Sequence, residues 1–322
     1  MSPLVRRLSG VLAQRSGQAL GVGLVVSVLC WLAVQRLPGD AAYRIAAGRY
    51  GHDLVTTSSA EAVRAELGLD RPAWQQLLAW LAAVPRLDLG ESLVTSRPVV
   101  TELGHHLVGT LQLAAAALVV AALIGVPLGL LAARRPGGLL DRVTIAWVAS
   151  VRALPPFLLG LLLVVLFSVH LGLLPAAGDG TPASLVLPAT TLGAGLSGLV
   201  ARMTRDVVVE VRASEYVGFA RTKGLPDGGV TRRHVVRNAA VALVPYLGAQ
   251  AILLVEGVVV VESLFAWNGL GHALVHAVFW RDVPVLQGTA LVLGLVVVAI
   301  NTAVDLAVVW LDPRPRNRGA AA

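Results

Sequence analysis

The chain has 322 residues, of which 56% are hydrophobic and only 14% are charged. Soluble globular domains are roughly 45–50% apolar and about 25% charged, so this composition excludes an ordinary soluble domain and predicts a membrane protein. The net charge of +7 does not indicate nucleic-acid binding, because the basic residues lie between long apolar runs. The single cysteine, Cys30, excludes an internal disulfide, and its apolar surroundings predict a packing role.

Six apolar runs are long enough to span a membrane, since crossing about 30 Å of hydrocarbon takes roughly 20 helical residues. The first lies between Arg15 and Arg36, and its length favours an uncleaved anchor over a cleavable signal peptide. The other five run from about Leu107 to Ala133, Val143 to Val169, Ser184 to Ala201, Ala239 to Val261 and Pro284 to Trp310. The predicted fold class is an all-α integral membrane protein with six transmembrane helices.

The distribution of arginine predicts the orientation, because basic residues in short loops resist translocation across the membrane. Arginines precede the first span, separate the second from the third, fill the loop 202–238 and follow the sixth span. The short loops of the opposite side hold only Arg281. Both termini are therefore predicted to be cytoplasmic. The expected organisation is a cytoplasmic N-terminus (1–16), a first transmembrane helix (17–35), an extracytoplasmic segment (36–106), a core membrane domain (107–311) and a cytoplasmic tail (312–322).

The extracytoplasmic segment is too polar to span the membrane, and its pattern predicts two helices. Ser58 and Glu61 have the spacing of a helix capping box, and residues 60–67 that follow favour a helix. Pro72 opens a second stretch, residues 73–84, with apolar residues at helical spacing. This amphipathic helix either packs against the bundle, rests on the outer membrane surface or receives a soluble partner.

The loop 202–238 is much longer than the other cytoplasmic connections and rich in arginine. Its centre predicts a short helix with Ser214 as N-cap and Gly224 at the C-terminal stop, where glycine tolerates a left-handed conformation. A turn and a second helix, residues 230–239, follow. Such an element suits contact with a cytoplasmic partner, whereas the alternative is a solvated loop whose arginines set the topology.

At these residues the chain resembles a known family, the permeases of binding-protein-dependent ABC transporters for dipeptides, oligopeptides and nickel. The matching residues of the cytoplasmic coupling loop are Glu215, Tyr216, Val217, Ala220, Arg221, Lys223, Gly224 and Leu225, followed by Arg233-His234 and Arg237-Asn238-Ala239. Further landmarks occur in the expected order, among them Leu37-Pro38-Gly39-Asp40, Asp88-Leu89-Gly90, Gly269-Leu270-Gly271 and Asp312-Pro313-Arg314. The resemblance covers nearly the whole chain.

The resemblance implies a transmembrane domain like that of type I ABC importers, placed in the inner cell membrane with residues 107–311 as the core permease domain. The solute would be a peptide or a related small solute, with nickel or a metal chelate as further options. Residues Glu215 to Leu225 would dock on a separate ATPase and couple its ATP hydrolysis to transport. The implied partners are a second permease subunit in a heterodimer, two cytoplasmic ATPase domains, an extracytoplasmic solute-binding protein and membrane lipid, and no nucleic acid.

The chain is expected to be a transport subunit without catalytic residues, an enzyme activity or a cofactor of its own. A phosphate-cradling loop ends in Gly-Lys-Ser or Gly-Lys-Thr, whereas Lys223, the only lysine, is followed by Gly224. ATP and Mg²⁺ are therefore expected on the partner ATPase subunits.

Two carboxylates are candidates for the substrate pathway. Glu256 stands within the fifth span where the family usually has a small residue, and a carboxylate there costs roughly 2.5–3.5 kcal/mol on insertion scales. We expect it to line the pathway and favour a cationic group of the solute, or else to be paired or protonated. Glu262, in the last external loop, is the second candidate. His272 and His276 have the spacing of metal ligands but lack a third ligand, so no metal site is predicted.

Two other classes of protein fit parts of the sequence. The run Gly195-Leu196-Ser197-Gly198 matches the short motif of intramembrane serine proteases, but the fifth and sixth spans contain no histidine and small residues also allow close helix packing. A proton-coupled secondary transporter fits six spans with carboxylates such as Asp305 but leaves the loop 202–238 unexplained. For Asp305, the family resemblance suggests a structural role.

Overall fold

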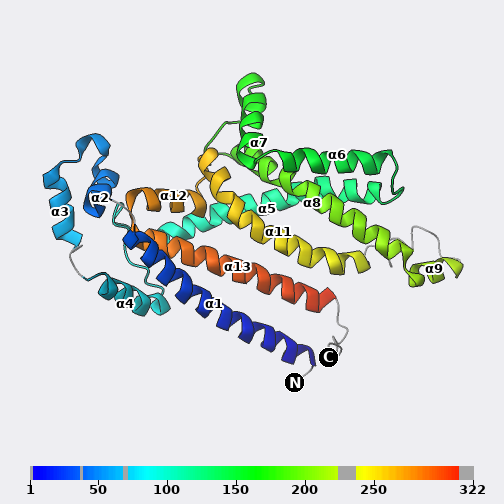
Figure 1. Cartoon of the computed structure of the whole chain (residues 1–322), viewed down its shortest axis with the longest axis horizontal. Helices are drawn as coiled ribbons and strands as arrows, with labels where there is room; N and C mark the ends of the chain where they lie inside the picture. Colours follow the sequence, from blue (N-terminus) through cyan, green and yellow to red (C-terminus); the bar gives the residue numbers. More distant parts are fainter. Residues whose placement is uncertain (1–2, 37–38, 68–71, 224–236, 312–322) are drawn as a thin grey trace.

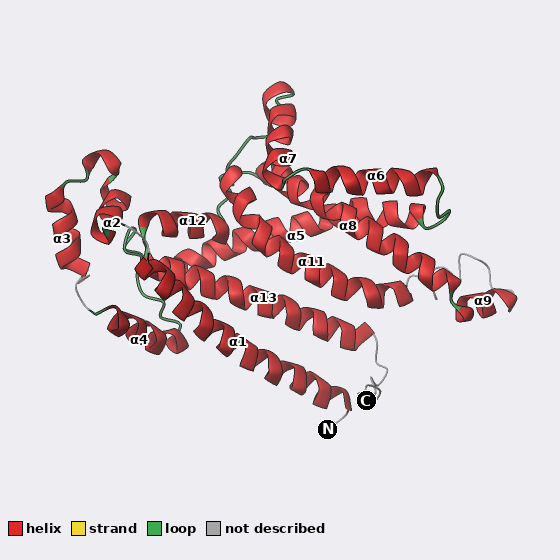
Figure 2. Cartoon of the chain, in the orientation of Figure 1, coloured by secondary structure: helices red, strands yellow, loops and turns green. Residues whose placement is uncertain are grey.

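The computed structural model describes residues 3–36, 39–67, 72–223 and 237–311, which fold into helices joined by short loops (Figure 2). Four candidate membrane spans lie in α1 (Pro3–Arg36), α5 (Val99–Ala132), α8 (Val186–Ala213) with its preceding 3-10 turn η4 (Pro182–Leu185), and α13 (Val283–Leu311). Two bent helix pairs raise the number to six if each pair is one span. The all-α membrane fold is confirmed, with four to six candidate spans.

The predicted span Val143 to Val169 is broken by a sharp bend. Helix α6 (Leu139–Ala153) and the pair α7 (Pro156–Leu163) and η3 (Val164–His170) meet at 99°. Pro155 and Pro156 lack the backbone N–H that a continuous helix needs, and the residue before a proline is forced out of the helical conformation. Helix α7 consequently projects from the other helices (Figure 1).

A milder bend divides the fifth predicted span. Helix α11 (Arg237–Leu264) consists of two apolar halves, Leu243–Val255 and Gly257–Leu264, that meet at 50°. The break falls at Glu256, the carboxylate that the sequence singles out.

Helices α5 and α8 form the centre of the bundle, and glycines let them approach closely. A Cβ atom on Gly125 would lie 2.6 Å from the carbonyl oxygen of Ser197, and one on Gly129 would lie 2.4 Å from that of Ala201. Both distances are far shorter than van der Waals contact. Because lipid tails are as apolar as the helices, such small-residue packing is a main source of helix association in membranes.

Helices α1 and α13 lie side by side (Figure 1). Arg15 donates from Nε and Nη2 to Oδ2 of Asp305 at 2.9 and 2.6 Å, which joins the two helices by an ion pair. This contact agrees with the structural role suggested for Asp305. Cys30, also on α1, is half-buried beside an apolar cluster of α12 (Leu270–Trp280) and α13, as predicted.

The segment between α1 and α5 contains three short helices: α2 (Ala41–Tyr50), α3 (Thr57–Leu67) and α4 (Ala73–Ala83), with the 3-10 turns η1 (His52–Leu54) and η2 (Val84–Arg86). The predicted helices over 60–67 and 73–84 are confirmed, whereas α2 was not predicted. On α4, Trp80 is buried and Trp74 is 57% exposed, so one face packs and the other is open.

The predicted capping box at Ser58 and Glu61 is wrong in register. The backbone N–H of Thr56 donates to Oγ of Ser59 at 2.9 Å, and that of Ser59 donates to Oγ1 of Thr56 at 3.2 Å. Thr56 and Ser59 thus form the reciprocal pair of bonds, two residues before the predicted position. Several hydroxyls compete at this helix start, and the earlier pair satisfies the backbone.

The short helices gather at opposite ends of the molecule (Figure 1). Helices α2, α3, α4 and α12 lie at one end, which we call the α12 end. Helix α9 (Glu215–Thr222) and the connection between α5 and α6 lie at the other, which we call the α9 end. The start of α1 also lies at the α9 end, so the described arginine-rich segments at the start of α1, between α5 and α6 and at the end of α8 share one end of the molecule.

Candidate coupling element and translocation site

Helix α9 occupies the centre of the loop 202–238, where the sequence predicts a short helix. The carbonyl oxygen of Ser214 accepts the first helical bonds, from the N–H groups of Val217 and Gly218 at 3.1 and 3.2 Å. Ser214 has an extended backbone and directly precedes α9, so it stands at the predicted N-cap position, and its hydroxyl donates back to the carbonyl of Val211 at 2.5 Å. The predicted C-terminal residues Gly224 and Leu225 lie outside the described residues.

Among the described side chains of α9, Val217 is the one that is buried against the bundle. Val217 is completely buried in a cluster with Ala133, Val207 and Val208. Glu215 is exposed, and Phe219 is 61% exposed with the ammonium of Lys223 4.6 Å from its ring centre. The side chains of the remaining predicted coupling residues, Tyr216, Ala220 and Arg221, lie outside the described residues. Helix α9 thus has a packed face and a face that carries an exposed aromatic ring.

A partly buried ion pair joins two helices of the bundle, and sequence reasoning missed it. Arg205 of α8 donates from Nε and Nη2 to the two oxygens of Asp141 at 3.1 and 2.9 Å. Asp141 is only 3% exposed and also accepts from the backbone N–H of Gly137 at 2.7 Å. The pair joins α6 to α8 and holds the connection that follows α5. The partners are too distant in the sequence for a spacing rule to find them.

The pathway candidate Glu256 lies in α11 at the bend, and its side chain lies outside the described residues. Next to it is a cavity of about 270 Å³ between α6, α7, α8 and α11. Its walls include Gln250, which is 6% exposed, and Gly195 and Gly257, beside which a Cβ would meet open space. Gly257, the residue after Glu256, also lines this cavity, and the pathway role of Glu256 stays a prediction.

The second pathway candidate, Glu262, is completely buried in the last turn of α11 and serves as a helix cap. Its Oε2 accepts from the backbone N–H groups of Gly271 and His272 at 2.7 and 3.2 Å, in the first turn of α12. Its Oε1 accepts from the hydroxyl of Thr110 at 2.7 Å, and that hydroxyl in turn accepts from the N–H of Leu270. These contacts assign a structural role; a direct role in the pathway stays a prediction.

Asp282 makes a similar link a little further along the chain. Its carboxylate accepts from the hydroxyl of Ser92 at 2.5 Å and from the backbone N–H groups of Leu93 and Val94. The N–H of Val285 in α13 also donates to it. Asp282 therefore fixes the segment before α5 onto the start of α13, although it is 190 residues away from Ser92.

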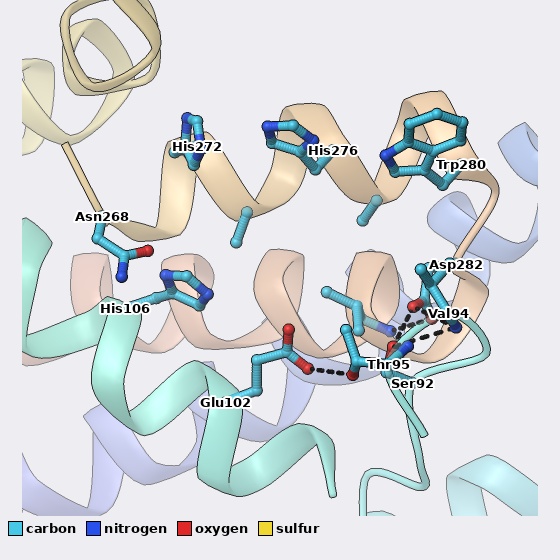
Figure 3. Close-up of a pocket in the computed structure, with 13 residues that line it drawn as sticks. Ser92, Val94, Thr95, Glu102, His106, Asn268, His272, His276, Trp280 and Asp282 are labelled. Atoms are coloured by element: carbon cyan, nitrogen blue, oxygen red, sulfur yellow. Dashed lines mark hydrogen bonds between the residues drawn. The ribbon is translucent and has the colours of Figure 1, made fainter. Parts of the chain in front are cut away.

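A cavity of about 290 Å³ opens at the α12 end, between α5, α12 and the segment around Ser92 (Figure 3). Glu102 and His106 of α5 face the cavity from below, and His272 and His276 lie on α12 above it. Burial, with neighbouring His276 and His106 as smaller contributors, lowers the pKa of His272. Among the described residues, no group of three or more potential ligands could hold a metal ion.

The serine of the protease-like motif has a packing role. Ser197 is completely buried, donates to the carbonyl of Ala194 at 2.7 Å and accepts from Nε1 of Trp147 at 2.9 Å. Gly198 lies against Val148 of α6, so a Cβ there would clash. Both residues thus serve close helix packing.

The helical bundle with a short helix exposed in its longest loop defines a polytopic membrane transport protein. A family model described as the inner membrane component of binding-protein-dependent transport systems matches residues 125–317. The chain is 38% identical over 317 residues to a putative peptide transport system permease protein of Brucella abortus, covering 96% of this chain and 99% of that one. The chain belongs to the family of binding-protein-dependent transport system inner membrane components.

Further relatives agree with this family assignment. The glutathione transport system permease protein GsiC of Pectobacterium atrosepticum is 38% identical over 295 residues, which cover 92% of this chain and 95% of GsiC. The inward-facing MetNI methionine ABC transporter is similar in fold, with a TM-score of 0.57 at 22% identity over 66% of this chain and 96% of that chain.

The family assignment confirms several predictions. The chain is a multi-pass inner-membrane permease subunit of an ABC importer, and ATP is bound by the partner ATPase of such a system. A solute-binding protein is the other partner that the family implies. The assignment replaces the two alternatives that the sequence left open, a proton-coupled secondary transporter and an intramembrane serine protease.

Proposed function

We propose that this chain forms half of the translocation pathway of an importer for peptides or a closely related small solute. The supporting observation is the near full-length similarity to permeases named for peptide and glutathione transport. A second, homologous permease subunit would complete a heterodimer and supply the other half, and two ATPase domains would bind on the cytoplasmic side.

The membrane topology that we propose has six spans and cytoplasmic termini, as in type I importers. The four straight spans and two bent pairs support the number six, and the arginine-rich segments at the α9 end support the orientation. Under this topology residues 1–16, 202–238 and 312–322 face the cytoplasm, residues 17–35 form the first span, residues 36–106 are extracytoplasmic, and residues 107–311 form the core permease domain.

We propose further that α9 is the coupling element. Its exposed aromatic face at the α9 end suits insertion into a cleft of an ATPase, while Val217 transmits the displacement to α8. Phe219 and Lys223 would contact the ATPase directly. The proposed pathway role of Glu256 draws support from its position at the bend of α11, next to the cavity lined by Gln250.

Site-directed crosslinking tests the coupling element. Because Cys30 is the only native cysteine, a Cys30→Ser background allows a single new cysteine at Phe219 in the assembled transporter. We expect Phe219→Cys to crosslink to the ATPase, and the equally exposed Phe157→Cys on α7 to give no such product. Crosslinking from both positions, or from Phe157 alone, would contradict the assignment.

Uptake by the reconstituted transporter tests the solute. Proteoliposomes that contain both permeases and the ATPases are supplied with the receptor and labelled dialanine, glutathione or nickel. We expect ATP-dependent uptake of a peptide, with purification of the complex also recovering a second permease. Uptake of nickel without uptake of either peptide would contradict the proposed peptide solute and identify a metal ion as the solute.

A further inference from the structure

We propose that the cavity at the α12 end binds the ammonium group of the incoming peptide, with Glu102 as its counter-ion. This inference rests on the proposed peptide solute and names the group that this part of the permease recognises. The cavity would therefore be an entry site, distinct from the mid-span cavity beside Glu256.

Polar side chains of α5 and α12 line the cavity, and the spacing of these residues puts each pair on one face of its helix. Glu102 and His106 are four residues apart on α5, and His272 and His276 are four residues apart on α12, so each pair lies on one helix face. Figure 3 shows one oxygen of Glu102 directed toward α12, while the rings of His272 and His276 stand on the side of α12 turned away from Glu102, where they line the rim of the cavity. His276 is exposed, so the cavity opens to the surface on its side.

The charges that line the cavity favour a cation. Among the described lining residues are the carboxylates of Glu102 and Asp282 and no lysine or arginine. Asp282 is occupied by Ser92 and backbone N–H groups, whereas the described hydrogen bond of Glu102 is a single one, from Thr95 to Oε2 at 3.2 Å. The other oxygen of Glu102 is therefore a better candidate than Asp282 for an ionic contact with the ammonium group. Arg97 acts on Glu102 electrostatically from outside the lining.

The imidazoles suit an ammonium group better than an anion or a metal ion. The lowered pKa of His272 keeps its ring uncharged at neutral pH, so a ring nitrogen can accept an N–H bond. The rings of His272 and His276 lie 4.5 Å apart in an edge-to-face arrangement rather than converging on one point. The indole of Trp280, also in the lining, adds an aromatic face of the kind that attracts cations.

The volume limits how much of the solute enters. About 290 Å³ lies at the lower end of the roughly 300–1,000 Å³ usual for ligand pockets, so the cavity suits one end of a peptide. A terminal ammonium with its first residue fits this description, and it is a group that peptides of every sequence share.

Histidine footprinting tests the site directly. The assembled transporter, without its solute receptor, is treated with diethyl pyrocarbonate, and mass spectrometry follows the modification of His272 and His276. Because the free amine of dialanine itself consumes the reagent, the modification of exposed His170, which lies outside the cavity, serves as the internal reference. Relative to His170, dialanine should slow the modification of His272 and His276, whereas N-acetyl-dialanine, which lacks the ammonium group, should not. Because a charge-assisted hydrogen bond contributes about 1.5–3 kcal/mol, Glu102→Gln should raise the half-protecting dialanine concentration at least about tenfold.

Controls separate the site from general damage to the protein. Glu61→Gln removes an exposed carboxylate on α3 and should leave protection unchanged. If Glu102→Gln fails to assemble, His276→Asn replaces it, with protection of His272 as the readout. Equal protection by both peptides, or full protection of the Glu102→Gln protein, would overturn the proposal. Protection by Zn²⁺ alone would also overturn it, in favour of a metal site.

The outcome is distinguishable from a failure of the proposed function. Uptake of labelled dialanine is measured in parallel with the receptor present. Uptake without histidine protection would refute the entry site and leave the peptide importer standing. Absence of peptide uptake under ATP would refute the proposed function itself.

Discussion

The two ends of the molecule are built in contrasting ways. At the α12 end, the buried carboxylates of Glu262 and Asp282 accept backbone N–H bonds from segments that are distant in the chain. At the α9 end, the described attachment of α9 centres on Val217, with Phe219 left exposed. The α12 end is held by directional bonds between distant segments, whereas helix α9 is held by a small apolar contact. The comparison predicts a rigid α12 end and a helix α9 that shifts on contact with a partner.

The largest expected effect comes from removing the carboxylate of Glu262. Glu262→Ala leaves the first N–H groups of α12 and the hydroxyl of Thr110 without their acceptor in a buried site. Each buried unsatisfied polar group costs about 1–3 kcal/mol, so we expect a loss of about 4 kcal/mol. Denaturation in mixed SDS micelles, followed by tryptophan fluorescence, measures the change.

The matched variant Glu262→Gln keeps one amide oxygen as an acceptor and should lose less than half as much stability. If Glu262→Ala were as stable as the wild-type protein, the capping role would be wrong and the α12 end would not differ from the α9 end in this respect. A direct role of Glu262 in transport would then be favoured over the capping role.

The fold was predictable where it depends on local pattern. The lengths of the apolar runs predict the spans, since the hydrocarbon thickness fixes the length that a helix needs. The helix at residues 215–222 was predicted from its flanking residues, and its role stays a prediction. The bend at Pro155 was not predicted, although the prolines that cause it are visible in the sequence.

Contacts between distant residues were beyond prediction from one sequence. Glu262 was predicted as a pathway residue from its place in the last external loop, because nothing local indicates that Thr110 and the start of α12 surround it. Likewise, Asp141 and Arg205 are 64 residues apart and meet only because α6 packs on α8. Spacing rules apply within one helix, and these side chains join different helices.

The second prediction concerns that ion pair, the strongest polar link near the α9 end. Asp141→Asn removes the charge opposite Arg205, which retains only Asp206 among its described carboxylate partners. Exposed pairs contribute up to about 1 kcal/mol and breaking a fully buried pair costs about 3–5 kcal/mol. We expect about 2 kcal/mol here, because the Arg205 side chain is 29% exposed and keeps Asp206 as a partner. The double variant Asp141→Asn with Arg205→Gln should lose less than the sum of the single variants. Additive losses in the same SDS assay would show that the pair is not coupled.

The third prediction tests the helix contact that joins the two ends. Gly125→Ala places a methyl group 2.6 Å from the carbonyl oxygen of Ser197, which forces α5 away from α8. Overpacking costs about 1–3 kcal/mol, so we expect a loss of about 2 kcal/mol. Gly195→Ala is the matched control, since its new methyl group meets open space and alanine favours a helix. Equal effects of the two substitutions on SDS unfolding would contradict the close α5–α8 contact.

The smallest effect on stability, and the most specific effect on coupling, is expected at Phe219. Its ring is 61% exposed, so Phe219→Ala should change the stability of the permease by less than about 0.5 kcal/mol. Val217→Ala on the same helix removes a buried side chain and should cost about 2 kcal/mol.

The effects of Phe219→Ala and Val217→Ala should differ further when the ATPase is present. An interface aromatic ring commonly contributes about 2 kcal/mol to binding, so Phe219→Ala should weaken ATPase binding about tenfold or more while leaving the permease folded. Affinity measured between the purified ATPase and the permease complex in nanodiscs provides the test. The exposed ring of Phe219 contributes little to the stability of the permease. If Phe219→Ala lowered that stability and left ATPase binding unchanged, α9 would be a structural element. The two ends of the molecule would then differ in rigidity alone.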